Sequence, residues 1–124
     1  MLMAGELTER VIGLAIEVHR QTGPGLLESV YEGCLCYELR EARIPFARQV
    51  SIPMIYKEMR LAEGFKADVV VAGTVILEIK SVTAILPLHE ALLHTYLRMS
   101  GLRIGLILNF NASRLSGGLR RFIM

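Results

Sequence analysis

The chain has 124 residues, the length of one ordinary domain, with 52% hydrophobic and 21% charged side chains. This composition supplies enough apolar surface for one core and excludes an intrinsically disordered chain. The formal net charge is +2, which is too small to indicate a nucleic-acid partner on its own. We therefore expect one domain over residues 1–124, and its function has to be inferred from particular residues.

No segment of the sequence predicts membrane insertion or export. The longest stretches without a charged residue, Val69 to Leu77 and Ile104 to Ser113, are far shorter than the roughly 18 apolar residues of a membrane-spanning helix. Met1 to Arg10 lacks the basic and apolar segments of an export signal, so we expect a cytoplasmic protein. Cys34 and Cys36 are too close together for an ordinary disulfide and lack a second pair for zinc, which predicts two reduced thiols.

Two amphipathic helices are predicted at the start of the chain. Apolar residues recur at steps of three and four from Glu6 to Arg20, with Thr8 as the expected N-cap. Gly23-Pro24-Gly25 ends this helix. A second helical pattern then runs from Leu27 to near Arg43, where Ile44 precedes Pro45.

From Arg48 the apolar period changes to two, which is typical of strands. The predicted strands are Arg48 to Tyr56, Phe65 to Val71 and Thr74 to Lys80, with a further short one around Met59 to Ala62. Lys57-Glu58 and Ala72-Gly73 are the expected turns between them, so the pairing should be antiparallel.

A helix and a strand complete the predicted fold. Pro87 lies in the first turn of the helix, which runs to about Ser100 and is closed by Gly101. Arg103 to Phe110 is nearly all apolar, as in a strand covered on both faces, and the short basic tail can form a helical turn or more. The expected class is α/β, with a mostly antiparallel mixed sheet of about four strands flanked by helices (order ααβββαβ).

The most informative segments are Gly64 to Asp68 and the triplet Glu78-Ile79-Lys80. On a strand, Glu78 and Lys80 point to one face while Ile79 points to the core on the other. A turn with an odd number of residues, such as Ala72 to Thr74, would place Asp68 directly across from Glu78. A two-residue turn would place Asp68 on the wrong face, so the site hypothesis requires an odd turn or a bulge.

Two carboxylates at cross-strand distance repel each other, and a divalent cation removes the conflict. The oxygens of Asp68 and Glu78, the backbone carbonyl of Ile79 and several waters form a shell that suits Mg²⁺ or Mn²⁺. Lys80, on the same face, could orient a water and offset charge on a phosphate under attack. These residue types in this pattern point to phosphodiester hydrolysis.

The arrangement of Asp68 with Glu78-Ile79-Lys80 resembles the core of the PD-(D/E)XK nuclease superfamily. Within it, Gly25-Leu26-Leu27-Glu28-Ser29-Val30-Tyr31 is similar to the signature of the GxxExxY protein family. The resemblance extends over almost the whole chain. Its further segments are Ala15 to His19, Gly64 to Asp68, His89 to Ala91, Thr95 to Leu97 and Gly105 to Asn111.

The resemblance implies an active site of Asp68, Glu78 and Lys80, with Glu28 as an additional carboxylate near the metal. Related nucleases place a glutamine four residues before the tyrosine of the helix that follows, and this chain has Leu92 there. A leucine cannot hydrogen-bond a water, a phosphate or a carboxylate, so the site lacks one polar supporting group. Tyr96 remains, one helical turn further on, and its hydroxyl could reach the phosphate or a site carboxylate.

The same residues also have explanations that involve only the stability of the fold. Glu78 and Lys80 could form a weak ion pair on a solvated strand face. Glu28, at the start of a helix, could simply favour the positive end of the helix dipole. Tyr31 falls on the apolar side of its helix and is expected to pack in the core, and the histidines are expected to serve as capping or hydrogen-bonded residues.

Three functions remain in view. The first is a small Mg²⁺- or Mn²⁺-dependent nuclease acting on DNA or RNA. The second is a binding module that keeps the fold, hydrolyses nothing and recognises nucleic acid or a partner protein, for which Leu92 is the best argument. The third is a structural homodimer subunit without a nucleic-acid partner, which the high apolar fraction allows.

Overall fold

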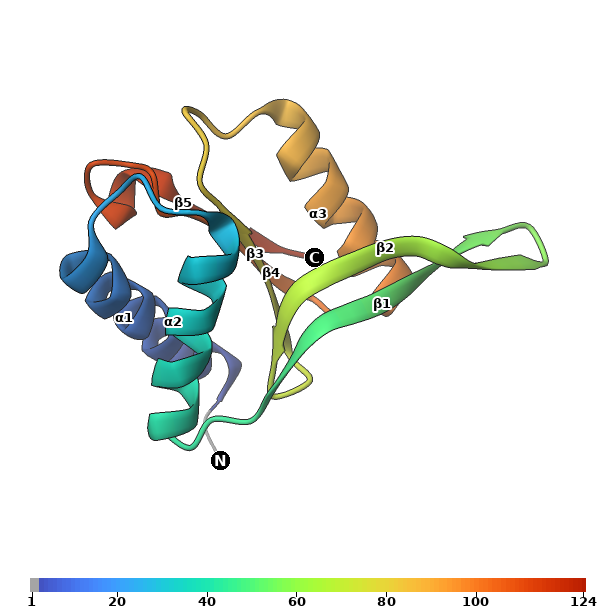
Figure 1. The fold of residues 1–124 in the computed structure, drawn as a ribbon. Helices are drawn as coiled ribbons and strands as arrows, with labels where there is room; N and C mark the ends of the chain where they lie inside the picture. Colours follow the sequence, from blue (N-terminus) through green and yellow to red (C-terminus); the bar gives the residue numbers. More distant parts are fainter. Residues whose placement is uncertain (1–2) are drawn as a thin grey trace.

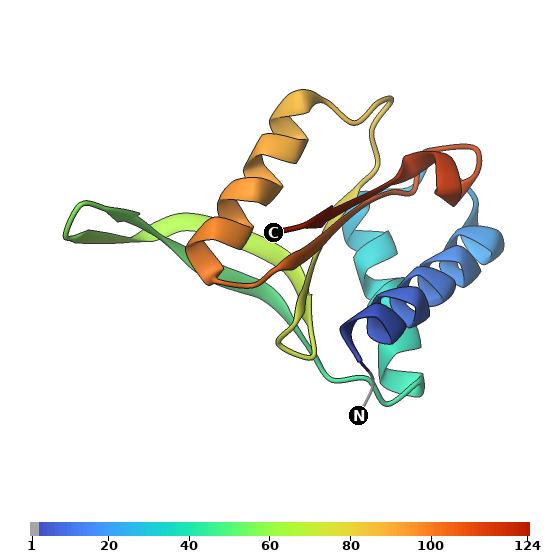
Figure 2. The same cartoon turned by 180° about the vertical axis from the view of Figure 1, so that it is seen from behind.

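The structure has three layers, with helices on both faces of one sheet. The computed structural model describes residues 3–124, apart from the side chains at positions 62 and 63. Helices α1 (Ala4–Thr22) and α2 (Glu28–Glu41) lie on one face of the sheet, and α3 (Pro87–Ser100) lies on the other (Figures 1 and 2). None of the helices in this described range is long and apolar enough to cross a membrane.

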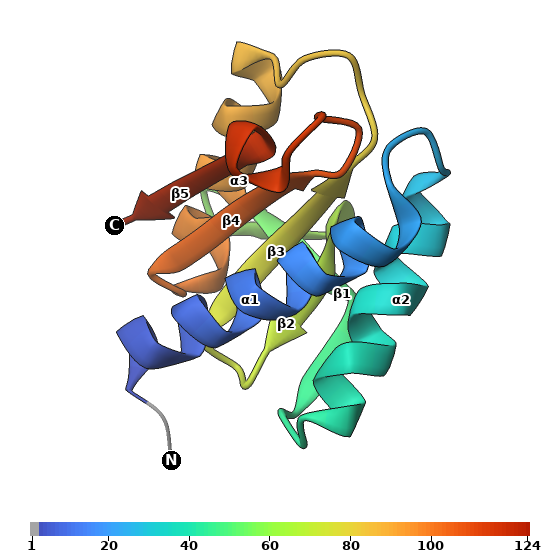
Figure 3. The ribbon, with the colours of Figure 1, turned by 90° about the vertical axis from the view of Figure 1, so that its left-hand side faces the viewer.

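The sheet has five strands that are neighbours in chain order (Figure 3). They are β1 (Phe46–Tyr56), β2 (Met59–Val71), β3 (Val75–Lys80), β4 (Ile104–Asn109) and β5 (Leu119–Ile123). Strands β3 and β4 are parallel and the other neighbours are antiparallel. Helix α3 connects β3 to β4, because parallel neighbours require a crossover.

The prediction of about four strands was wrong by one strand. The basic tail forms a short 3₁₀ helix (Leu115–Gly118) and then β5, which pairs antiparallel with β4. Strand β5 lies at the edge of the sheet, and only Leu119 and Phe122 are partly buried in it, so its sequence carries little apolar alternation. The expected short strand around residues 59–62 is the beginning of the long strand β2.

The predicted helices are all present, with differences at their ends. Helix α1 begins at Ala4, so the prediction that Thr8 caps it was wrong. The Thr8 side chain is buried in the second turn, and its hydroxyl donates to the Ala4 carbonyl at 2.8 Å. Helix α3 begins and ends where the sequence predicts, and Gly101 closes it with a left-handed backbone at φ 78°.

Two apolar clusters lie on the two faces of the sheet. The first joins the sheet to α1 and α2 and contains Val75, Leu77 and Ile79 of β3. The second joins the sheet to α3 and contains Ile76 of β3 together with Ile107 of β4. Both central strands are therefore covered on both faces, which confirms the expectation for β4 and explains why they read as continuous apolar runs.

The outer halves of β1 and β2 leave the sheet and project as a two-stranded arm (Figures 1 and 2). The pairing shifts at the base of the arm, because Ile52 pairs with Phe65 while Met54 pairs with Leu61. A β-carbon on Gly64 would lie 3.0 Å from the Met54 nitrogen, so this shift brings the two backbones close together. The alternating apolar pattern continues into the arm, where Tyr56 is exposed.

Candidate active site

The turn between β2 and β3 has the odd length that the site hypothesis requires. Val71 pairs with Val75 and Val69 pairs with Leu77, so Ala72 to Thr74 form a three-residue connection. Ala72 and Gly73 both have positive φ angles, and the Thr74 N–H donates to the Val71 carbonyl at 2.9 Å. Extended by one residue beyond the last pair, this register places Asp68 opposite Glu78.

Asp68 and Glu78 lie where β2 separates from β3. The regular ladder ends at Val69 and Leu77, and beyond that point the two carboxyl groups accept the backbone N–H groups. The Ile79 N–H donates to Asp68 Oδ2 at 2.7 Å, and the Asp68 N–H donates to Glu78 Oε1 at 3.3 Å. Each carboxyl is thus held by the neighbouring strand, and the two are brought together at the end of the hairpin.

The two carboxyl groups disfavour each other's charge. Burial, followed by the repulsion from Asp68, raises the pKa of Glu78 to about 8. The pKa of Asp68 is also raised, mainly by burial, against the hydrogen bond from the Ile79 backbone. Glu78 is only 6% exposed, so solvent does little to relieve this repulsion. A divalent cation between the carboxyls would favour the charged form of both.

Lys80 ends β3 on the same face as Glu78 and is half-buried. Its positive charge lowers the pKa of both Asp68 and Glu78, so the ammonium group lies close to the pair. Within residues 3–124, apart from the side chains at positions 62 and 63, no carboxylate lies within 4.0 Å of this ammonium group. It is near the carboxyls without being locked to either one.

Tyr96 approaches the same pair from α3. Its side chain is buried, and its ring centroid lies 5.3 Å from that of Phe65 on β2. Burial first, and then the charges of Glu78 and Asp68, raise the pKa of the Tyr96 hydroxyl to about 12. The hydroxyl is therefore a neutral hydrogen-bond donor beside the carboxyls.

The sequence model of the PD-(D/E)XK nuclease superfamily matches residues 5–122. This chain belongs to that superfamily. The three helices and the mixed sheet are consistent with its fold, and its nucleases typically use divalent metal ions. No curated protein and no solved structure matches the chain. In this PD-(D/E)XK protein the converging residues Asp68, Glu78 and Lys80 stand where the sequence motif predicts them.

The donor set of this PD-(D/E)XK site is small. Among the residues that the structure describes, no group of three or more His, Cys, Asp or Glu side chains is placed to hold a metal ion. The oxygen donors that converge are the two carboxyls of Asp68 and Glu78. Two carboxylates suit Mg²⁺ or Mn²⁺, which keep several waters, and do not suit a structural zinc ion.

Glu28, the first residue of α2, contacts the loop that follows β3. Its Oε2 accepts the Ser81 N–H at 3.0 Å, and the Ser81 hydroxyl donates to the Leu26 carbonyl at 2.6 Å. A hollow of about 430 Å³ lies beside these residues. The charge of Glu28 makes a small contribution to the raised pKa of Glu78, so Glu28 lies at the margin of the site. Neither interpretation of Glu28 from the sequence, as a carboxylate near the metal or as a partner of the helix dipole, included this contact with the Ser81 backbone.

Ile79 contributes to the site through its backbone. The N–H group holds Asp68, while the side chain is buried in the cluster against α1 and α2. Coordination of a metal by the Ile79 carbonyl stays a prediction.

Three residues near Asp68 were missed by the sequence analysis. Glu32 is 6% exposed, and its two oxygens accept hydrogen bonds from Arg48 Nε and Gln49 Nε2, both at 2.9 Å. The charge of Glu32 contributes to the raised pKa of Asp68. The sequence does contain one indication that Glu32 lies near the site, because Glu32 follows Glu28 by one helical turn and therefore shares its face of α2.

The structural interpretation of Tyr31 is confirmed. Its ring is fully buried and stacks on Phe110 at a centroid distance of 4.6 Å. Its hydroxyl donates to the Gly23 carbonyl at 2.6 Å and accepts the Leu26 N–H at 3.1 Å. Tyr31 therefore anchors the loop between α1 and α2.

The histidines and cysteines also take structural positions. A His19 ring nitrogen hydrogen-bonds the Ala112 carbonyl at 2.8 Å, and His89 Nδ1 accepts the Leu86 N–H at 3.0 Å, which caps α3. His94 packs edge-on against Phe122. Cys34 and Cys36 are free thiols, half-buried and buried respectively, which confirms the prediction.

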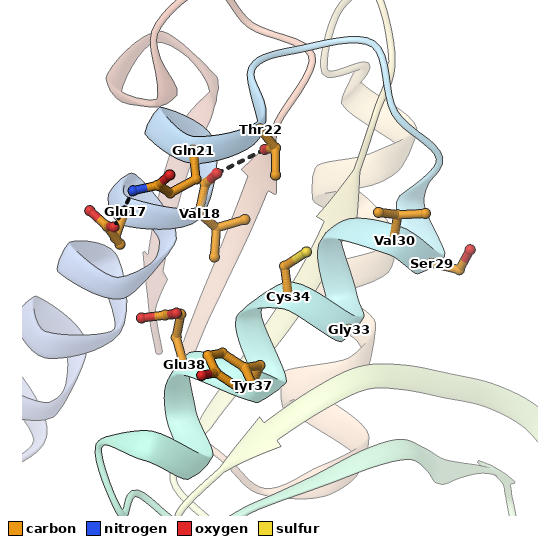
Figure 4. A pocket seen from close by; sticks show the side chains of 10 residues that line it. All are labelled: Glu17, Val18, Gln21, Thr22, Ser29, Val30, Gly33, Cys34, Tyr37 and Glu38. Carbon is orange, nitrogen blue, oxygen red and sulfur yellow. Dashed lines mark hydrogen bonds between the residues drawn. The ribbon is translucent and has the colours of Figure 1, made fainter.

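A second hollow, of about 460 Å³, lies between α1 and α2 (Figure 4). Val18 and Gln21 of α1 line it together with Val30, Cys34 and Tyr37 of α2. None of the six predicted site residues, which are Glu28, Asp68, Glu78, Ile79, Lys80 and Tyr96, lines this hollow.

Proposed function

We propose that this PD-(D/E)XK protein is a Mg²⁺- or Mn²⁺-dependent nuclease that hydrolyses phosphodiester bonds in DNA or RNA. The observation that carries the proposal is the pairing of the Asp68 and Glu78 carboxyls at the end of the β2–β3 hairpin, beside Lys80. Burial and mutual repulsion make this pair costly unless a cation or a proton compensates it. A structural ion pair would give no reason to keep two carboxyls together.

Asp68 and Glu78 would hold the metal ion, with the Ile79 carbonyl and Glu28 as further candidate ligands. The ion, when bound, supplies positive charge that offsets the charge of the phosphate under attack. Lys80 lies close enough to both carboxyls to orient the attacking water and to offset charge in the transition state. Tyr96 keeps its proton at neutral pH, because its pKa is about 12, and can donate a hydrogen bond to the phosphate.

We also propose that the chain belongs to the GxxExxY family within this superfamily. The signature residues Gly25, Glu28 and Tyr31 have connected structural roles that support this assignment. Gly25 takes a positive φ of 96°, and Tyr31 fixes the loop that contains it. Glu28 then joins α2 to the loop after β3. The signature thus positions the start of α2 against the strand that carries Glu78 and Lys80.

Cleavage of a mixed panel of single-stranded and duplex DNA and RNA in Mn²⁺ tests the proposed activity. The parent should cleave at least one substrate, and the Asp68→Asn, Glu78→Gln double variant should fall to the background rate. A matched control, Glu9→Gln with Glu41→Gln, removes two exposed carboxyls and should cleave like the parent. Equal cleavage by the double variant and the parent would exclude these carboxyls from the chemistry.

The second candidate is a nuclease-fold module that binds nucleic acid or a partner protein without cleavage. Leu92 favours it, because this half-buried leucine lies one helical turn before Tyr96 on α3. The same panel separates the two functions when binding is measured beside cleavage. A parent that binds a substrate, cleaves none and is unaffected by the double substitution would support the binding module.

A further inference from the structure

Gln49 lies directly opposite Asp68 in the β1–β2 pair, at a break in the pairing. Arg48 pairs with Val69 and Val50 pairs with Ala67, which leaves Gln49 and Asp68 facing each other without a regular strand pair. Gln49 has a φ of 50°, in the left-handed region that side chains with a β-carbon disfavour. Strand β1 therefore has a sharp local bend at the position that faces the candidate metal ligand.

In strand β2, the inward-facing side chains change from one face of the sheet to the other at the same place. Ala67 packs in the cluster under α3, whereas Val69, two residues further on, packs in the cluster under α1 and α2. In a regular strand, residues two apart lie on the same face. This change of face occurs at Asp68, and it lets the Asp68 carboxyl lie at the separation of β2 from β3, where the Ile79 N–H holds it.

The Gln49 side chain contacts Glu32, the buried member of an ion pair with the exposed Arg48. Its Nε2 donates to Glu32 Oε1 at 2.9 Å, while Arg48 Nε occupies Glu32 Oε2 at 2.9 Å. Because Glu32 is almost fully buried and carries a paired charge, it is a firm anchor for the amide. The same amide faces Asp68 across the strand pair, and its interaction with the carboxyl lowers the pKa of Asp68 against the effect of burial.

We propose that Gln49 is a positioning residue of the candidate metal site, whose amide spans from Glu32 to Asp68 and holds the Asp68 carboxyl for metal binding. The inference rests on the proposed function. It assigns to β1 a supporting amide of the kind that Leu92 cannot provide from α3. Gln49 touches neither the phosphate nor the water in this role and acts through Asp68.

The backbone bend and the amide can be separated by two substitutions. Gln49→Met keeps the length of the side chain and the bend but removes the hydrogen bonds. Gln49→Gly removes the amide and relieves the strained backbone, because glycine accepts a positive φ. Gln21→Met is the matched control, since Gln21 makes a hydrogen bond of the same length, 2.9 Å, to Glu17 on the exposed surface of α1.

The measurement is the Kd for Mn²⁺, from the electron paramagnetic resonance signal of the free ion, at a temperature where circular dichroism shows every variant fully folded. Loss of fold stability then cannot account for a change in Kd. We expect both Gln49 variants to bind Mn²⁺ about tenfold more weakly than the parent, and Gln21→Met to bind like the parent.

Three results would contradict the inference in different ways. A parent-like Kd for both Gln49 variants would overturn the positioning role and leave the proposed nuclease in place. A parent-like Kd for Gln49→Gly alone would overturn it as well, because this variant lacks the amide and would still bind Mn²⁺ normally. A parent that binds Mn²⁺ no better than the Asp68→Asn, Glu78→Gln variant would overturn the proposed function and the inference together.

Discussion

Glu78 combines two conditions that both disfavour a charged carboxyl. It is almost excluded from water, and among the negative charges around it Asp68 raises its pKa the most. In the absence of a cation, a pKa of about 8 keeps Glu78 protonated at neutral pH. If the pair binds a metal ion as proposed, binding should therefore release protons near pH 7.

The raised pKa of Glu78 predicts how stability depends on pH without metal. The folded state keeps the Glu78 proton up to about pH 8, whereas the unfolded chain loses it near the ordinary value of 4.5. The stabilising effect is complete below pH 4.5 and is lost as the pH rises through 8. Between pH 5 and 8.5 the unfolding free energy of the parent should fall more than that of Glu78→Gln, by on the order of 3 kcal/mol. Urea denaturation in a chelating buffer checks this, and parallel pH curves for the two proteins would contradict it.

Lys80 is expected to act on the reaction and to contribute little to the fold. Lys80→Ala should lower turnover by roughly 10² to 10⁴, because the role proposed for the ammonium group is to position the water and offset transition-state charge. The unfolding midpoint should stay close to that of the parent. Lys66→Ala, on the exposed part of β2, is the control and should leave turnover unchanged. Unchanged turnover in Lys80→Ala would remove the assignment.

At the scale of elements, apolar periodicity predicted the three helices and the inner strands well. The predicted ends of α3 agree with the structure, because proline favours the first turn of a helix and glycine favours its C-cap, and Pro87 and Gly101 lie at these positions. Strand β5 was missed because an edge strand with mostly exposed residues has little apolar alternation to detect. The register of β2 and β3 was left open, since Ala72-Gly73 resembles a two-residue turn and only the structure shows that Thr74 belongs to the connection.

The turn before β5 packs tightly against the end of β4. A β-carbon on Gly118 would collide with the Asn109 carbonyl oxygen, while one on Gly117 would meet nothing within 4 Å. The buried Asn109 amide hydrogen-bonds both the N–H and the carbonyl of Val82, at 3.1 and 3.0 Å. Gly118→Ala should therefore destabilise the protein by about 1 to 3 kcal/mol, and Gly117→Ala should cost clearly less. Thermal unfolding of the two variants tests this, and equal losses would show that the turn tolerates the added methyl group.

Leu92 is where α3 departs from the pattern of related nucleases. It is half-buried and, within the described part of the chain, is a member of neither apolar cluster, so a polar group is tolerable there. Leu92→Gln should fold and should cleave the substrate panel in Mn²⁺ at least as fast as the parent, because the new amide lies one turn from Tyr96. A loss of about 1 to 3 kcal/mol in unfolding free energy would show instead that the amide is buried without a partner. A folded variant as inactive as an inactive parent would favour the binding module.

At the scale of the whole molecule, the candidate site lies where the three layers meet. Strands β2 and β3 supply Asp68 and Glu78, α3 supplies Tyr96, and the start of α2 supplies Glu28 (Figure 1). No single element contains the site, so the packing of α2 and α3 on opposite faces of the sheet determines which groups surround the carboxyls.

This architecture explains which site residues the sequence could indicate. The motif of Asp68, Glu78 and Lys80 lies within one hairpin, so strand periodicity and an odd turn place its members together. Gln49 reaches the site through the long β1–β2 pairing, and Glu32 of α2 reaches it through the hydrogen bonds that it accepts from Arg48 and Gln49 of β1, which periodicity does not describe. Self-association, location in the cytoplasm and a single domain over the full chain stay predictions.

The most direct test of the account is the anomalous diffraction of manganese in crystals of the parent protein grown or soaked in Mn²⁺. We predict one anomalous peak between the Asp68 and Glu78 carboxyls, with an oxygen of each residue at bonding distance, and no peak there in the Asp68→Asn, Glu78→Gln variant. A manganese ion bound elsewhere, or an empty site in crystals whose Asp68 and Glu78 carboxyls point apart, would contradict it.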